Sequence, residues 1–381
     1  MTMKFGGIQS TTAALKNALA VQGTTVNEAM LLGIGGGLGA GYILWEFKAH
    51  GSAKIVMGFT NRWNYYAERL TLLCQRVGAN PVVQEVTGAK AAEKNLNDAL
   101  SRGKPFLVWV DKAHLPHQHL PESLKGHIPY ALGIHGAEGD NICVDDMGAA
   151  LYAVPRSDFT AARGRIGSDK NRLLLIENPG KIDYEPLIQA GIDEHIEHLS
   201  RDSDSFSLPV YKKWAKLLTD TKNKKGWPTV FNTRNGLYAT LRSVYEGVVV
   251  DGTEGNGLRM LYADFITESA DLLGKPALNE AAEAYRKAGQ LWRTFGESAL
   301  SDKVFASTKT LIDQRYEALK HNQSDKVKET VDAVERLNDE FQQEFPLDDA
   351  AINRLYDLMQ SNLMAVYDAE VAALETLKRV N

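Results

Sequence analysis

Hydrophobic and polar positions alternate in two different ways along the chain, and the change falls near residue 178. Before it, stretches with helical spacing are interleaved with short apolar or β-branched runs. The helical spacing covers residues 13–21, 65–77 and 89–101. The strand-like runs are residues 82–86, 106–110, 127–134, 141–144 and 151–154, with a hairpin signal at Gly136–Gly139 between the third and the fourth. This half is therefore expected to combine helices with a sheet.

The second half predicts helices only. Glu177-Asn178-Pro179-Gly180 is typical of a linker, and prolines stand at or near the later joins. Apolar residues with helical spacing occupy residues 183–199, 210–219, 237–246, 257–273, 278–295, 302–320, 326–344 and 348–379. We expect an α+β domain over residues 1–176 and an all-helical domain over residues 183–381 that covers the cleft of the first.

The stretch 5–47 carries the most unusual local sequence. A Gly6-Gly7 turn leads into Ser10, Thr11 and Thr12, whose hydroxyls are typical of a helix start. A second apolar run opens at Asn27-Glu28 and ends in a dense set of glycines, which allow close approach of other groups to the backbone. These are Gly33, Gly35, Gly36, Gly37, Gly39 and Gly41.

The glycines match the loose dinucleotide pattern at Gly35-x-Gly37-x-x-Ala40. A nucleotide site of this kind also needs an acidic residue about 20 positions later for the ribose, and residues 47–67 contain no Asp or Glu. The run therefore indicates a backbone-lined channel wall or a tight packing loop rather than a nucleotide site.

Composition narrows the range of partners and locations. The net charge of −5, without a basic stripe interleaved with aromatics, argues against nucleic acid. Two cysteines, Cys74 and Cys143, make no disulfide framework and read as core residues, so we expect a cytoplasmic protein. The N-terminus lacks the features of a signal peptide, and the glycine-rich residues 29–47 are a poor membrane span.

Histidines suggest metal binding only weakly. Five of the nine histidines lie between residues 114 and 135, but their spacing matches no established zinc site and Pro116 and Pro121 predict an irregular loop. Glu194-His195 and Glu197-His198 have ligand spacing on a helix, although a solvated helix face explains them more simply. No metal and no cofactor are expected.

Ser10 is the candidate nucleophile. Free N–H groups at a helix start favour a developing oxyanion, but a serine hydroxyl also needs a base. His127 begins a predicted strand, and Asp145 or Asp146 ends the next one, which gives the chain order Ser, His, Asp. The simpler alternative makes Ser10 a helix cap and His127 a polar residue at a strand edge.

Several motifs together resemble a known family. FGGIQSTTAALKN, NEAMLLGIGGGLGAGY, VDKAHLP, GHIPYALGIHG and DDMG are similar to the N-terminal domain of the butirosin biosynthesis protein H family. GNGLRMLYADFITESADLL, with Arg259 and Tyr262, is similar to the helical domain of uncharacterised function that usually follows it. Together the two resemblances cover nearly the whole chain.

The resemblance implies a papain-like cysteine-protease fold adapted to acyl transfer. The family's named member moves an aminoacyl chain from a carrier-protein thioester onto an amine of an aminoglycoside. The family has His-Cys where this chain has Gln9-Ser10, so the catalytic position falls on Ser10, with His127 as base and Asp146 as the acid, Asp145 being one step away. Gln9, Gly35, Gly36, Gly37, Arg259 and Tyr262 are the expected substrate contacts.

The loss of the cysteine leaves three functions open. Ser10 could serve as nucleophile of an acyltransferase of specialised metabolism, with a carrier-protein or other thioester donor and a small-molecule acceptor. The protein could instead be an inactive binding or scaffold homologue, because a serine lacks the thiolate that eases this chemistry. An amidase or peptidase would use the same residues. A serine introduced by engineering at the family's cysteine position is disfavoured, because Gln9 also differs from the family's histidine.

The long apolar stripe over residues 348–379 suggests a homo-oligomer.

Overall fold

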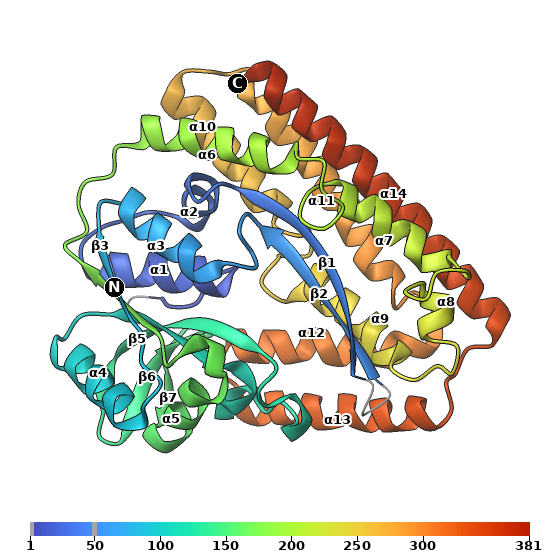
Figure 1. Cartoon of the computed structure of the whole chain (residues 1–381), viewed down its shortest axis with the longest axis horizontal. Helices are drawn as coiled ribbons and strands as arrows, with labels where there is room; N and C mark the ends of the chain where they lie inside the picture. Colours follow the sequence, from blue (N-terminus) through green and yellow to red (C-terminus); the bar gives the residue numbers. More distant parts are fainter. Residues whose placement is uncertain (1–3, 48–51) are drawn as a thin grey trace. The chain divides into compact units, whose positions relative to one another are not determined.

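The computed structural model describes residues 4–47 and 52–381 (Figure 1). The chain forms an α+β protein with a largely helical C-terminal part. Its contacts divide it into two compact units. The first unit comprises residues 1–31, 70–183 and 314–332, and the second comprises residues 32–69, 184–313 and 333–381. The boundary at Asp183–Tyr184 lies near the expected linker. Two segments differ from a simple division there: residues 32–69 belong to the second unit, and residues 314–332 belong to the first.

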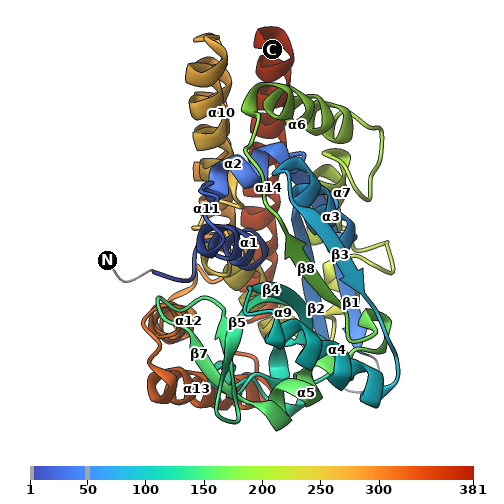
Figure 2. The same ribbon diagram turned by 90° about the vertical axis from the view of Figure 1, so that its left-hand side faces the viewer.

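The first unit is built on a six-stranded sheet in which all neighbouring strands are antiparallel (Figure 2). The strand order is β3-β8-β4-β5-β6-β7. The bounds are β3 Asn80–Gln84, β4 Phe106–Asp111, β5 Pro129–Glu138, β6 Asn141–Asp145, β7 Tyr152–Pro155 and β8 Leu173–Glu177. The five expected strands are confirmed. β8, a buried Leu-Leu-Leu-Ile run next to β4, was not predicted.

Helices cover both faces of this sheet. Alternate residues of β4 and β5 join α4 and α5 in one apolar cluster that includes Phe106, Val108, Leu132 and Ile134. On the other face, α1 packs against β5, where a Cβ at Gly133 would lie 3.5 Å from the Ala14 methyl. The helices on the sheet are α1 Ser10–Val21, α4 Ala89–Ser101 and α5 Arg156–Arg165. α2 Glu28–Ile34 and α3 Tyr66–Arg76 divide between the two units.

The second unit packs long helices around a two-stranded hairpin. Its helices include α6 Tyr184–Leu199, α7 Pro209–Thr219, α8 Trp227–Val230, α9 Leu237–Tyr245, α10 Arg259–Leu273, α11 Leu278–Ser298 and α14 Asp349–Val380. α14 runs beside α11 and α7 (Figure 1). α12 Ala306–Lys320 and α13 Ser324–Gln343 divide between the two units.

Short helical turns occur in both units: η2 Lys112–His114, η3 Pro116–Gln118, η4 Glu122–Leu124, η5 Gly167–Asp169, η6 Glu246–Val250 and η7 Lys303–Phe305.

The hairpin, β1 Leu38–Phe47 and β2 Ser52–Thr60, was not predicted, because glycines obscure its alternation. The Trp63 indole lies over two of them: a Cβ at Gly41 or Gly58 would come within 2.4 Å of that ring. The glycines thus make room for an aromatic side chain.

Of the helices in the described residues, none combines the length and the apolar character that a membrane crossing needs.

Candidate active site

Ser10 is the first residue of α1, and Gln9 rather than Ser10 caps this helix. Gln9 is extended (φ −111°, ψ 122°), and its Oε1 accepts hydrogen bonds from Thr12 N at 3.1 Å and Thr11 Oγ1 at 2.6 Å. This cap satisfies an N–H that the helix itself leaves unpaired. The alternative that made Ser10 the cap is therefore wrong. The half-buried Ser10 hydroxyl is not used for capping.

A buried carboxylate holds the turn that precedes Ser10. Glu28, at the start of α2, accepts hydrogen bonds from Ile8 N and Gln9 N, each at 3.1 Å, and from Thr12 Oγ1 at 3.2 Å. Gly7 leaves room for this side chain, since a Cβ there would lie 2.1 Å from Glu28 Oε1. The sequence showed Glu28 only as part of a helix start. It positions the backbone that carries Ser10.

A second buried carboxylate holds the turn that carries His127. The histidine is exposed and lies two residues before β5. The fully buried Asp111, at the end of β4, accepts hydrogen bonds from Gly126 N at 2.6 Å and Ile128 N at 3.3 Å. The same carboxylate contacts His114 Nδ1 at 2.6 Å. Asp111 is thus a positioning residue for the backbone on both sides of His127. It lies within the motif VDKAHLP, but that motif assigned no role to this carboxylate.

Asp145 and Asp146 are adjacent but make contacts in different directions. Asp145 is opposite Gly133 on the face that packs on α1, where it accepts hydrogen bonds from Gly6 N at 3.0 Å and Asn17 Nδ2 at 2.9 Å. This carboxylate attaches the N-terminal segment to α1 and the sheet. Asp145 therefore serves an anchoring role, comparable to those of Glu28 and Asp111.

Asp146 instead forms a buried pair with His117. Its Oδ2 contacts His117 Nε2 at 2.8 Å and Gln118 Nε2 at 2.8 Å, and its Oδ1 accepts from Tyr130 Oη at 2.7 Å. Burial alone would raise the pKa of Asp146. The hydrogen bond and charge of His117, together with Lys112 and Tyr130, outweigh burial and lower the pKa to about 2. Asp146 is therefore ionised near neutral pH.

His117 completes this cluster. Its ring stacks on Tyr152 with centroids 3.9 Å apart, and its Nδ1 is buried without a hydrogen-bond partner among the described residues. Sequence reasoning had counted His117 only among the possible zinc ligands. The contacts bring Asp146 to His117, whereas the assignment of Asp146 as the group that orients His127 stays a prediction. Tyr130, three residues after His127, links Asp146 to the start of β5.

The clustered histidines have separate partners. His114 contacts Asp111, His119 contacts Ser324 Oγ at 2.8 Å, and His135 lies 3.5 Å from Asp145. Within residues 4–47 and 52–381, no three side chains of the metal-ligating types gather in a group that could hold an ion.

The glycine run lies in the second unit, where it is closely packed. Gly36 and Gly37 have positive φ of 89° and 70°, which favours glycine. A Cβ at Gly37 would lie 2.7 Å from His195 Nδ1, and one at Gly36 would lie 2.6 Å from Asn61 Nδ2. The run joins a helix to a strand, the reverse of the order in a dinucleotide site. These contacts agree with the tight packing loop.

His195 is buried rather than on a solvated helix face, and His198 is also buried, so that expectation is wrong. His195 Nδ1 accepts a hydrogen bond from Leu38 N at 3.1 Å, so its Nε2–H donates to Tyr285 Oη, 2.6 Å away. Burial lowers the pKa of His195 well below its ordinary value. The ring is therefore neutral and acts as a structural link between the glycine run and α11.

Arg259 and Tyr262, the expected acceptor contacts, are fully buried in the same unit. The Arg259 guanidinium pairs with Glu370 and donates to Gly257 O, and the Tyr262 ring stacks on His195 with centroids 4.4 Å apart. This burial favours a structural role. The assignments of both residues, and of Gln9 and Gly35 to Gly37, to substrate binding stay predictions.

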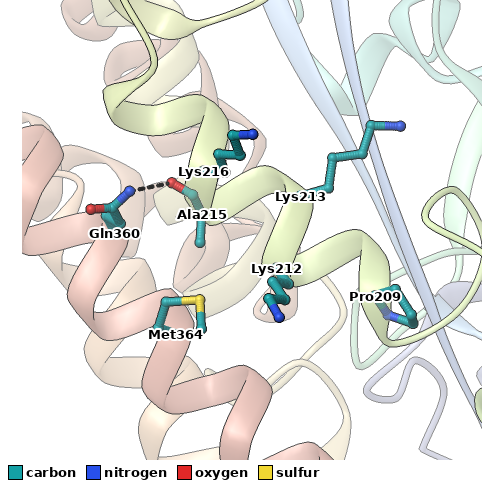
Figure 3. A pocket seen from close by; sticks show the side chains of 7 residues that line it. All are labelled: Pro209, Lys212, Lys213, Ala215, Lys216, Gln360 and Met364. Atoms are coloured by element: carbon teal, nitrogen blue, oxygen red, sulfur yellow. Dashed lines mark hydrogen bonds between the residues drawn. The ribbon is translucent and has the colours of Figure 1, made fainter.

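A cavity of about 420 Å³ lies between α7 and α14 (Figure 3). Its lining consists of Pro209, Lys212, Lys213, Ala215, Lys216, Gln360 and Met364. In Figure 3 the Lys212 side chain points away from those of Lys213 and Lys216, and Lys213 is paired with Asp204 at 3.0 Å. None of the residues assigned to the chemistry lines this cavity, so we place no reaction there.

The first unit is thus an α+β domain in which a serine begins a helix packed on an antiparallel sheet, and a histidine precedes a strand of that sheet. Residues 9–146 match the N-terminal domain of butirosin biosynthesis protein H, and residues 158–331 match a domain of unknown function, DUF4872. The first match confirms the resemblance that the motifs predicted, over residues 9–146. No curated protein matches the chain.

Proposed function

We propose that this protein is an acyltransferase of specialised metabolism that moves an acyl group from a thioester onto an amine or hydroxyl of a small molecule. The observation that carries the proposal is the family match over residues 9–146, which begins at the start of α1, where Ser10 has a hydroxyl that is not used for capping. The packing of α1 on the antiparallel strand β5 supports a papain-like arrangement.

In the proposed reaction Ser10 Oγ attacks the thioester carbonyl, and His127 accepts the hydroxyl proton. N–H groups in the first turn of α1 stabilise the oxyanion. The C–S bond then breaks, and the thiol leaves with a proton from His127, so that an ester remains on Ser10. An amine or hydroxyl of the acceptor attacks this ester, its proton passes through His127, and the Ser10 hydroxyl is restored. Asp146 is the acid of the proposed triad, and its carboxylate orients the His127 imidazole.

Intact mass spectrometry of the full chain with an acyl thioester tests the nucleophile. We expect an increase equal to one acyl group, located on the peptide that contains Ser10. Ser10→Ala should abolish the adduct and turnover, and Ser10→Cys should react faster because a thiolate is the better nucleophile. Ser101→Ala, at an exposed helix end, is the matched control and should change nothing. Full turnover by Ser10→Ala would contradict the proposal.

Separate substitution of the two histidines tests the base. We expect His127→Ala to lower turnover by a factor of about 10²–10⁴, as for loss of a general base. His117→Ala should act more weakly, through the position of Asp146 and Tyr130. The opposite order, with His117→Ala the more damaging at equal stability, would transfer the role of base to the His117–Asp146 pair.

A binding protein without covalent chemistry is the second candidate, and the serine at the family's cysteine position favours it. It predicts ligand or carrier-protein binding that survives Ser10→Ala, with no adduct in the wild type. Product analysis with and without candidate amines separates transfer from the hydrolysis that an amidase or peptidase would perform on the same residues.

A further inference from the structure

Arg69 is a buried arginine whose guanidinium lacks partners on one side. It lies in the first turn of α3, and only 1% of the residue is exposed. Within the described parts of the chain, its Nε and Nη2 have no hydrogen-bond partner. Burial lowers the pKa of Arg69 to about 10, and no carboxylate counteracts this effect. The group is still a cation near neutral pH, so an unbalanced charge is held out of water.

The two unpartnered atoms belong to the same edge of the guanidinium. The N–H bonds of Nε and Nη2 point in parallel, and this edge receives two oxygens of one carboxylate or phosphate. Loss of a single hydrogen bond would leave one of these atoms unpaired. Here both donors of one fork are available together, which is the pattern expected of a site for a two-oxygen ligand.

Other buried arginines of the described chain differ from Arg69 in this respect. Arg163 has the same lowered pKa of about 10, but its Nη1 and Nη2 donate to Ala92 O at 3.4 Å and Asn171 O at 2.9 Å. Arg259 pairs with Glu370, and Arg315 Nη2 donates to Gln118 Oε1 at 3.1 Å. Nε of Arg163 and of Arg315 also lacks a partner among the described residues, but Nη2 of each donates a hydrogen bond. Arg69 differs from these two arginines because both donors of the fork, Nε and Nη2, are unpartnered.

An unpaired buried charge is costly, and buried charges in proteins are ordinarily paired or bound to a ligand. We infer that Arg69 is the receptor for an oxyanion, a carboxylate or phosphate group of a ligand, held by two parallel hydrogen bonds from Nε and Nη2. The inference does not rest on the proposed acyl transfer, because it concerns a binding group that the reaction at Ser10 does not use.

The test measures binding of inorganic phosphate and of acetate to the full chain by calorimetry and thermal unfolding. Ionic strength is held constant with sodium chloride, so that screening does not change. We expect at least one of the two anions to bind saturably with one site per chain and to raise the unfolding temperature as that site fills. Binding of phosphate alone identifies a phosphoryl ligand, and binding of acetate alone identifies a carboxylate.

Two variants assign the site. Arg69→Met should abolish saturable binding, and Arg69→Lys should weaken it roughly tenfold or more, because lysine keeps the charge but lacks the fork. Arg163→Met is the control, because Arg163 is similarly buried but its Nη1 and Nη2 are hydrogen-bonded; this variant should retain wild-type affinity even where it lowers stability. Should Arg69→Met fail to fold, Arg69→Lys decides. Unchanged affinity in the Arg69 variants, or no saturable binding of either anion to the wild type, would overturn the inference.

Discussion

The two units hold irregular backbone in place by different means. In the first, buried carboxylates of Glu28, Asp111 and Asp145 accept hydrogen bonds from loop N–H groups. In the second, glycines bring the backbone against Phe265, Trp63 and His195. A carboxylate anchor fixes a turn through its backbone N–H groups rather than through the neighbouring side chains. Ring packing fills the space beside the backbone. The candidate nucleophile Ser10 and the candidate base His127 both belong to carboxylate-anchored turns.

The strongest test of the ring-packed unit is Gly33→Ala. The added Cβ would lie 2.1–2.3 Å from atoms of the buried Phe265 ring. We expect a loss of at least about 3 kcal/mol, because a filled core cannot relax easily. Five of the six tryptophans lie in the second unit, so tryptophan fluorescence during urea unfolding reports it. Gly164→Ala, on the exposed side of α5, should be neutral or stabilising. Equal effects at the two positions would contradict the packing argument.

For the carboxylate-anchored unit, Asp111→Asn should loosen the turn around His127. An amide can replace only one acceptor oxygen, so one of the two N–H groups at Gly126 and Ile128 loses its partner. We expect a cost of about 2 kcal/mol, within the range for an unsatisfied buried group. Hydrogen exchange at these two amides measures it. Asp98→Asn, which breaks an exposed pair with Lys94, is the control and should change stability by less than about 0.5 kcal/mol. Unchanged exchange would remove Asp111 as an anchor.

The His117–Asp146 pair should make the first unit sensitive to acid. The pKa of Asp146 is lowered from 3.8 to about 2 in the folded protein, so the unfolded chain takes up a proton first as the pH falls. The stabilisation is fully present above pH about 4 and is lost as the pH falls through about 2. Asp146→Asn should remove this part of the pH dependence. A stability difference between the two proteins that stays constant down to pH 2 would show that the pair does not lower the pKa.

The smallest expected effects come from two buried tyrosines that surround His195. Tyr285→Phe leaves His195 Nε2–H without its acceptor and should cost about 1 kcal/mol. Tyr262→Phe removes a hydroxyl that has no hydrogen-bond partner among the described residues, so stability should hold or rise slightly. Urea unfolding followed by fluorescence compares them. Because Tyr262 was also a predicted acceptor contact, a raised KM for the acceptor in Tyr262→Phe would favour that role over the structural one.

Periodic apolar patterns determined most of the elements. The five expected strands appear where the pattern predicted, and so do the helices from α6 onwards except the short α8, since a repeat of 2 or 3.6 residues needs only one buried face. β8 and β4 are both short buried runs without alternation, but the Leu-Leu-Leu-Ile of β8 lacks the aromatic and valine residues that mark β4 as a strand. The hairpin was missed because its glycines carry no side chains that reveal a period. The family resemblance could also be recognised from the sequence, because the motifs that carry it are short and continuous.

Contacts between residues far apart in the sequence were decided only by the tertiary structure. Ser10 and His127 were identifiable as residue types at element starts. Glu28 and Asp111 lie within the quoted motifs, but their role in holding these turns was not visible in the sequence. The sequence could not show that Asp146 would meet His117, or that His195 would be buried. A carboxylate's role depends on which N–H groups the fold brings within 3 Å of it, and no local pattern encodes that distance.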